Sequence, residues 1–251
     1  MDPTSRFSDR VELYQRYRPG YPQGVIDLLR RECGLASGAV VADIGSGTGI
    51  FTRLLLAADA QVIAVEPNAE MRHAAQRLLA KEPRLTSSPG RAEATGIAAG
   101  SIDLYTAAQA FHWFDQAAAR REMLRILKPG GAIAILFNDR QTTTTPFLIA
   151  YEQLLKRFAT DYHLVDHRRV DRAQLEAFCA PAPIRTVHLP NQQRFDLAGL
   201  SGRLNSSSYA PPPGHPAHAP MMQELARLFA LFSVDGLVAI HYTTEVTYAR
   251  R

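Results

Sequence analysis

The sequence predicts a doubly wound α/β fold: a seven-stranded, mostly parallel sheet with helices on both faces, an antiparallel pair at one edge and a helical cap or insertion. Between residues 39 and 139, short apolar runs alternate with amphipathic stretches of helical spacing. Strands that alternate with helices of about ten to fifteen residues form right-handed crossovers between parallel strands. Two later segments, 184–196 and 236–250, alternate in polarity and suit the antiparallel pair.

Each element follows from local patterns. An irregular, Tyr-rich arm comes first, and the first helix begins at Pro22, because proline favours the first helical position, and stops at Gly34. Asn68 is the expected N-cap of a later helix. In chain order we expect strands at 39–44, 61–67, 84–90 (weak), 101–111, 132–139, 184–196 and 236–250, and helices at 22–33, 48–59, 68–83, 116–131, 146–160, 171–180 and 220–232.

The rhythm of strands and helices changes after Asp139, and this change suggests how the chain is organised. Residues 1–139 are expected to form the arm and the parallel core. Residues 140–215 are expected to form a cap on the substrate side, including the sixth strand, and residues 216–251 the last helix and edge strand. A chain of 251 residues has about the size of one large core with an insertion.

Composition excludes several classes of protein. The net charge is only +4 and the basic residues are mixed with acidic ones, so a nucleic-acid partner is not expected. No window is long and apolar enough for a membrane helix, and the N-terminus lacks the apolar core of a signal peptide. Cys33 and Cys179 have no neighbouring Cys or His, so neither a disulfide framework nor a metal site is indicated. A cytoplasmic location is expected.

The stretch DIGSGTG, residues 43–49, is a glycine turn between a strand and a helix. It lacks the third glycine of the dinucleotide fingerprint, where Ile50 stands, and it lacks the Lys-Ser or Lys-Thr pair of a phosphate-binding loop. Asp43 at the strand end would repel a pyrophosphate but suits a ligand with an ammonium group. The turn therefore favours a cationic amino-acid moiety over a phosphate.

This turn resembles the first motif of class I S-adenosylmethionine (SAM)-dependent methyltransferases, which have a Rossmann-like core. Glu66 ends the next strand, where the family places an acidic residue for the ribose hydroxyls. The stretches GRAEATGIAAGSIDLYTAAQAFHWFD and LKPGGAIAILF also resemble the family, and the likeness covers about residues 38–139. Within the family, the chain resembles the type 11 methyltransferase domains. YQRYRPGYP and YTTEVTYAR are similar to segments of small-molecule methyltransferases related to trans-aconitate methyltransferase, whose arm folds over the cofactor.

The resemblance implies roles for individual residues. Arg18 is expected to clamp the SAM carboxylate, Asp43 to lie near its amino group, and Glu66 to accept the ribose hydroxyls. Arg91 stands where the subgroup often has an acidic residue for adenine. The expected cofactor residues are Arg18, Asp43, Gly45, Ser46, Gly47, Glu66, Pro67, Met71, Ala92, Glu93 and Gln109, and the expected substrate residues are Tyr14, Tyr17, Tyr21, His112, Trp113 and Tyr209. Each of these also has a plain structural interpretation, as a turn former, a packing residue or a solvated side chain.

The implied activity is transfer of the SAM methyl group, by in-line displacement, to an O or N atom of a small-molecule acceptor, with secondary metabolism as the expected setting. His112 follows the fourth strand at the edge where such sheets bind ligands, and it is the candidate general base. Two alternatives stay open: methylation of RNA or protein, and a SAM-fold protein that binds without catalysis. The expected assembly is a monomer or a homodimer, and the acceptor is not identified.

Overall fold

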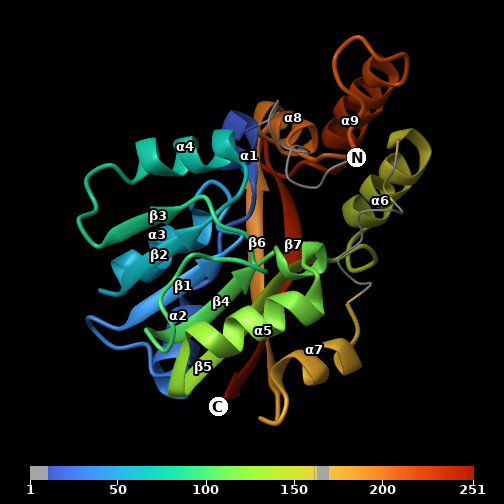
Figure 1. Cartoon of the computed structure of the whole chain (residues 1–251). Coiled ribbons are helices and arrows are strands. Elements are labelled where there is room, and N and C mark those ends of the chain that lie inside the picture. The colour runs from blue at the N-terminus through green and yellow to red at the C-terminus, as the bar shows by residue number, and fades with distance from the viewer. Residues whose placement is uncertain (1–10, 161, 163–169) are drawn as a thin grey trace.

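The computed structural model describes residues 11–160, 162 and 170–251 (Figure 1). Within these residues a seven-stranded sheet has the order β3-β2-β1-β4-β5-β7-β6. Its strands are β1 (Val40–Ile44), β2 (Gln61–Val65), β3 (Leu85–Ser88), β4 (Ile102–Ala108), β5 (Leu127–Arg140), β6 (Arg185–Phe195) and β7 (Val238–Arg250). β1 to β5 pair in parallel, and β7 is antiparallel to both β5 and β6. The predicted doubly wound sheet with an antiparallel edge pair is confirmed.

Helices cover both faces of the sheet. The α-helices are α1 (Val11–Tyr17), α2 (Gln23–Cys33), α3 (Ile50–Ala57), α4 (Ala69–Leu78), α5 (Gln116–Ile126), α6 (Pro146–Phe158), α7 (Arg172–Cys179), α8 (Leu197–Asn205) and α9 (His218–Phe232), with a 3-10 turn η3 at Phe111–Trp113. α2 and α3 bury their apolar sides on one face, and α5 and α7 on the other. The strands between them are apolar on both faces, as parallel strands covered on two sides require.

A third apolar cluster lies beside the antiparallel strands. α6, α8 and α9 pack on one another and on the ends of β6 and β7, and Figure 1 shows these helices gathered away from β1 to β3. The expected cap, 140–215, contributes α6 and α8, while α9 comes from the segment after it. The division of the chain into three parts stays a prediction. None of the described helices has the length and apolar character needed to cross a membrane.

Several local expectations differ from the structure, and the helix expected at 68–83 already ends at Leu78. The arm is not irregular: Val11–Tyr17 forms α1, which lies between α4 and α8. The helix expected to end at Gly131 ends at Ile126, because Leu127 already pairs with Ile102 of β4 and the Lys-Pro-Gly-Gly stretch bulges from the strand. The strand expected to run to Phe111 ends at Ala108. α8 was not expected, since its two glycines weaken the helical pattern.

Other local signals hold. The Asn68 side chain accepts a hydrogen bond of 2.9 Å from the backbone N–H of Met71, so the predicted N-cap is confirmed. Gly34 ends α2 in the left-handed conformation with φ +70°, where a side chain would be strained. Gly34 therefore fixes where α2 ends before the loop to β1. Asn68 fixes where α4 begins after β2.

Candidate functional site

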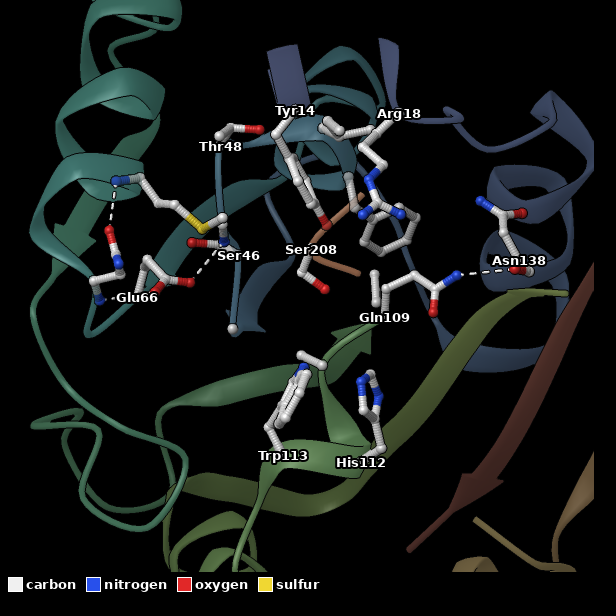
Figure 2. A pocket seen from close by; sticks show the side chains of 18 of the residues that line it. Tyr14, Arg18, Ser46, Thr48, Glu66, Gln109, His112, Trp113, Asn138 and Ser208 are labelled. Carbon is white, nitrogen blue, oxygen red and sulfur yellow. Dashed lines mark hydrogen bonds between the residues drawn. The ribbon is translucent and has the colours of Figure 1, made fainter. Parts of the chain in front are cut away.

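A cavity of about 270 Å³ opens beyond the carboxyl ends of β1, β2, β4 and β5 (Figure 2). The strand order reverses between β1 and β4, and open α/β sheets bind their ligands at such a switch point. Sixteen of the predicted site residues line this one cavity: Tyr14, Arg18, Tyr21, Asp43, Gly45, Ser46, Gly47, Glu66, Pro67, Met71, Ala92, Glu93, Gln109, His112, Trp113 and Tyr209. The structure thus brings them together, and their individual roles stay predictions.

Tyr17 is the exception, because it is not among the lining residues. Its ring packs on Gly202 of α8: a Cβ added to Gly202 would lie 2.2 Å from the Tyr17 Cε2 atom. The last turn of α1 turns this side chain toward the cluster of α6, α8 and α9. Tyr17 therefore joins the arm to α8, and the expectation that it lines the substrate side is corrected.

The glycine turn brings bare backbone to the cavity wall. A Cβ on Gly45 would lie 2.4 Å from the Cβ of Ala110, so only glycine fits between the turn and the segment after β4. Gly47 has φ +55° and faces the sulfur of Met71, which would lie 3.8 Å from an added Cβ. Backbone and a polarizable thioether therefore line this part of the cavity.

Glu66 is held in place by two backbone groups. Its Oε2 atom accepts a hydrogen bond of 2.8 Å from the N–H of Gly47, and its Oε1 atom accepts one of 2.8 Å from the N–H of Asn68. Burial raises the pKa of this carboxyl group, while the two N–H donors act in the opposite direction. Each oxygen keeps a second lone pair, so the carboxylate is oriented to accept hydroxyl groups from a ligand.

Asp43 and Thr48 are two further residues of the cavity wall. Asp43 is 1% exposed and accepts hydrogen bonds from the hydroxyls of Thr52 (2.6 Å) and Thr106 (3.1 Å). Burial raises the pKa of Asp43 to about 6. The Thr48 hydroxyl is buried and has no hydrogen-bond partner within the described part of the chain. An unpaired buried hydroxyl on a cavity wall fits a polar ligand. Thr48 is not among the site residues that the sequence predicts.

The side of the cavity expected to hold adenine is partly occupied by internal contacts. Met71 and Ala92 are each 5% exposed, so both present small or polarizable surface. Glu93 accepts a hydrogen bond of 2.9 Å from the N–H of Asp115, and its Oε2 lies 3.6 Å from Arg91 Nε. Arg91, which stands where the subgroup often has an acidic residue, thus forms an ion pair with the neighbouring Glu93.

The arm reaches the cavity through Arg18. Its guanidinium lies 4.8 Å from the centre of the Tyr14 ring and donates a hydrogen bond of 3.1 Å to the carbonyl of Ser206. Figure 2 shows Tyr14 and Arg18 pointing into the cavity from the same side. The Nε atom of Arg18 is buried and unpaired within the described residues, so a donor is left for a ligand.

The tip of β4 forms the opposite wall. Gln109 has the unusual φ of +57°, and its side chain donates a hydrogen bond of 3.0 Å to the carbonyl of Asn138. His112 and Trp113 stand in η3 with ring centroids 4.7 Å apart. In Figure 2 both rings face the open space below Gln109 and Ser208. Strained backbone next to a cavity is frequent at functional sites.

Several lining residues were not predicted: Asn138, Arg140, Tyr162, Arg203, Ser208 and Tyr242. Asn138 and Arg140 end β5, so their position at the carboxyl end of a parallel strand was a usable signal. Arg203 and Ser208 come from α8 and the loop after it. No local pattern could have placed them, because they reach the cavity only through the packing of α8 on α1.

Comparisons with known proteins agree with this geometry. A family model described as a methyltransferase domain matches residues 42–135. An uncharacterized methyltransferase-like protein of Schizosaccharomyces pombe is 32% identical over 156 residues, and the match spans 62% of this chain and 59% of that protein. An uncharacterized methyltransferase of Mycobacterium tuberculosis is 36% identical over 237 residues, covering 84% of this chain and 93% of that protein.

The fold also has a similar solved structure. A protein from Anaeromyxobacter dehalogenans, named as a type II methyltransferase, superposes with a TM-score of 0.69 and 22% sequence identity. The superposition covers 93% of this chain and 98% of that one. The likeness therefore extends beyond the parallel core to the antiparallel strands and their helices.

Proposed function

Because this chain belongs to the class I SAM-dependent methyltransferase family, we propose that it binds SAM in the cavity and methylates an O or N atom of a small molecule. The observation that carries the proposal is the fixed Glu66 carboxylate beside the bare backbone of Gly47, at the switch point of the sheet. This geometry supports a ligand whose vicinal hydroxyls reach Glu66 while a neighbouring part lies against bare backbone.

The residues present fit such a cofactor. Glu66 would accept the ribose hydroxyls, Met71 and Ala92 would flank the adenine, and Arg18 would pair with the carboxylate. The buried, unpaired Thr48 hydroxyl and Arg18 Nε supply polar partners that the protein itself does not satisfy. When bound, SAM supplies a methyl group on a positively charged sulfur.

The protein's own contribution is position, enclosure and proton transfer. α1 and the loop after it would close over the cofactor and exclude water, which makes the reacting groups meet in one geometry. A ring nitrogen of His112 would accept the proton of an alcohol, phenol or amide acceptor. An acceptor that is already a carboxylate or a neutral amine would not need this base.

A cavity of about 270 Å³ supports an acceptor of limited size over RNA or protein. A setting in secondary metabolism, a cytoplasmic location, a monomeric or homodimeric state and the likeness to trans-aconitate methyltransferases remain expectations.

Calorimetry with S-adenosylhomocysteine (SAH), the expected product, tests cofactor binding directly. We expect a dissociation constant near or below about 10 µM, equivalent to about −7 kcal/mol. Transfer of labelled methyl groups from SAM to carboxylates, phenols and amines, and separately to RNA and protein, then tests the acceptor class. Absence of SAH binding at millimolar concentration, or transfer only to macromolecules, would contradict the proposal.

A further inference from the structure

We propose that Arg140 and Arg203 form an anion-binding subsite in the acceptor half of the cavity, and that the methyl acceptor carries a carboxylate or phosphate group. This inference rests on the proposed function, since it assigns the chemical class of the acceptor at the same site. Both side chains line the cavity and are about nine-tenths or more buried, with Arg140 10% and Arg203 5% exposed.

Arg140, at the end of β5, is only partly satisfied by the protein. Its Nη2 atom donates to Glu152 Oε2 at 2.5 Å and to the Tyr162 hydroxyl at 2.8 Å. Its Nη1 atom is buried without a hydrogen-bond partner in the described residues. Glu152 is itself shared, because Lys156 lies 3.6 Å from its other oxygen. One carboxylate thus faces two cations, and Arg140 keeps a free donor.

Arg203, on α8, has no carboxylate partner among the described residues. Its Nε atom donates to the Tyr242 hydroxyl at 3.1 Å, and its Nη1 atom donates to the Ser207 hydroxyl at 3.0 Å. These bonds hold the guanidinium in position but leave its charge unpaired. A buried charge without a counter-charge is costly, and an anionic ligand would remove that cost.

The positive charges of several arginines act on one residue of the cavity wall, Tyr209. Arg203, Arg140 and Arg18 together lower the pKa of the Tyr209 hydroxyl, although burial alone would raise it. Burial lowers the pKa of Arg18, and the positive charge of Arg203 lowers it further. Tyr209 lines the same cavity as all three arginines, so their guanidiniums and this phenol share one wall.

The arrangement suits an oxyanion rather than a neutral polar group. Guanidinium groups present paired N–H donors that match carboxylate and phosphate oxygens, whereas the hydroxyl proton of Tyr162 is already donated to Glu152. Arg18 is already assigned to the cofactor carboxylate, so Arg140 and Arg203 are the cations left for the acceptor. The acceptor's anion would fix its orientation while another atom faces the methyl group.

Three small probes test the subsite by calorimetry on SAH-saturated protein: glutarate, inorganic phosphate and the neutral glutaramide. We expect glutarate, phosphate or both to bind at least about tenfold more tightly than glutaramide, a difference of about 1.4 kcal/mol. Preference between glutarate and phosphate identifies which anion the subsite takes. Binding of neither anion at about 20 mM, or equal binding of glutaramide, overturns the proposal without any variant.

Variants assign the effect to residues. Arg203→Gln, and Arg140→Gln combined with Glu152→Gln so that no carboxylate is left unpaired, should each weaken anion binding at least tenfold. Arg120→Gln is the matched control, because Arg120 is half-buried and donates to the Ala180 carbonyl outside the cavity. SAH affinity should change less than threefold. A tenfold loss of SAH affinity in Arg203→Gln would place this arginine on the cofactor and overturn the proposal.

The same titrations without SAH separate this inference from the proposed function. Anion binding with no SAH binding would leave the subsite in place and contradict the methyltransferase assignment of the cavity. SAH binding with no anion preference would do the reverse.

Discussion

Glu66 and Gly47 are joined by a hydrogen bond of 2.8 Å from the backbone N–H to Oε2, which ties the carboxyl end of β2 to the glycine turn after β1. The same carboxylate accepts from the N–H of Asn68, which caps α4. One side chain thus couples a strand end, a glycine turn and a helix start. The turn is therefore shaped before any ligand arrives, which lowers the entropy that binding must overcome.

Glu66→Ala should weaken SAH binding by at least about tenfold to a hundredfold, because it removes both the ribose acceptor and the contact that shapes the turn. Glu66→Gln keeps one acceptor oxygen and should lose less. Calorimetry with SAH measures both. Glu70→Gln, in the first turn of α4 and exposed, is the control with the same loss of charge as Glu66→Gln. Equal SAH affinity in Glu66→Ala and wild type would remove Glu66 from the cofactor site.

Asp43 should make the free energy of unfolding depend on pH in a defined direction. Its pKa is raised from 3.8 to about 6 in the folded protein, mainly by burial, so the folded state favours the protonated form. The resulting stabilisation is complete below pH 3.8 and is lost as the pH rises through 6. A pKa change of this size corresponds to roughly 3 kcal/mol in the free energy of unfolding.

Urea unfolding of wild type and Asp43→Asn between pH 4 and pH 8 measures this effect. Relative to the variant, wild type should lose about 2–3 kcal/mol across the range. Asp103→Asn is the control: the Lys128 ammonium and the Val40 N–H, opposed by partial burial, lower the pKa of Asp103 from 3.8, so its contribution is lost only below about pH 4 and its difference from wild type should stay nearly flat between pH 4 and pH 8. A pH-independent difference between wild type and Asp43→Asn would contradict the raised pKa.

His112→Ala should lower turnover by about a hundredfold or more if the acceptor needs deprotonation, with little change in SAH affinity, because a positioned base contributes about 10²- to 10⁴-fold. Steady-state kinetics at saturating acceptor, together with SAH calorimetry, separates the two effects. His188→Gln is the control, since its ring is 59% exposed on β6 and pairs with Glu245. Unchanged turnover at saturating acceptor would exclude His112 from the mechanism.

Asn138 should matter for stability out of proportion to its size. Its Nδ2 atom donates to the Gly20 carbonyl, and its Oδ1 atom accepts from Thr244 (2.5 Å) and Asn191 (3.1 Å), so it joins the arm to three strands. Asn138→Ala should cost about 2–4 kcal/mol in urea unfolding, because it leaves buried partners unpaired. Asn191→Ala removes a more exposed donor to the same carbonyl and should cost less. Equal losses would contradict the role of Asn138 as the centre of this network.

Much of the parallel core could be predicted, because its signals are local. Periods of apolar residues, the Asn68 cap and the glycines at residues 45 and 47 act over a few neighbouring positions, and the structure keeps them. The predicted end of α5 was wrong for the same reason. A Pro-Gly-Gly stretch reads as a helix stop, but pairing with β4 ends the helix earlier.

The sequence by itself determined the alternation of strands and helices from β1 to β5, the glycine turn and the acidic residue that follows β2, since each depends on residues close together in the chain. Only the tertiary structure decided that Arg18 meets Ser206, 188 positions away, that Tyr17 packs on Gly202, and that Arg203 and Arg140 line one cavity. These contacts follow from the packing of α1 against α8, which no local periodicity encodes, and they shape the half of the cavity where the acceptor would bind.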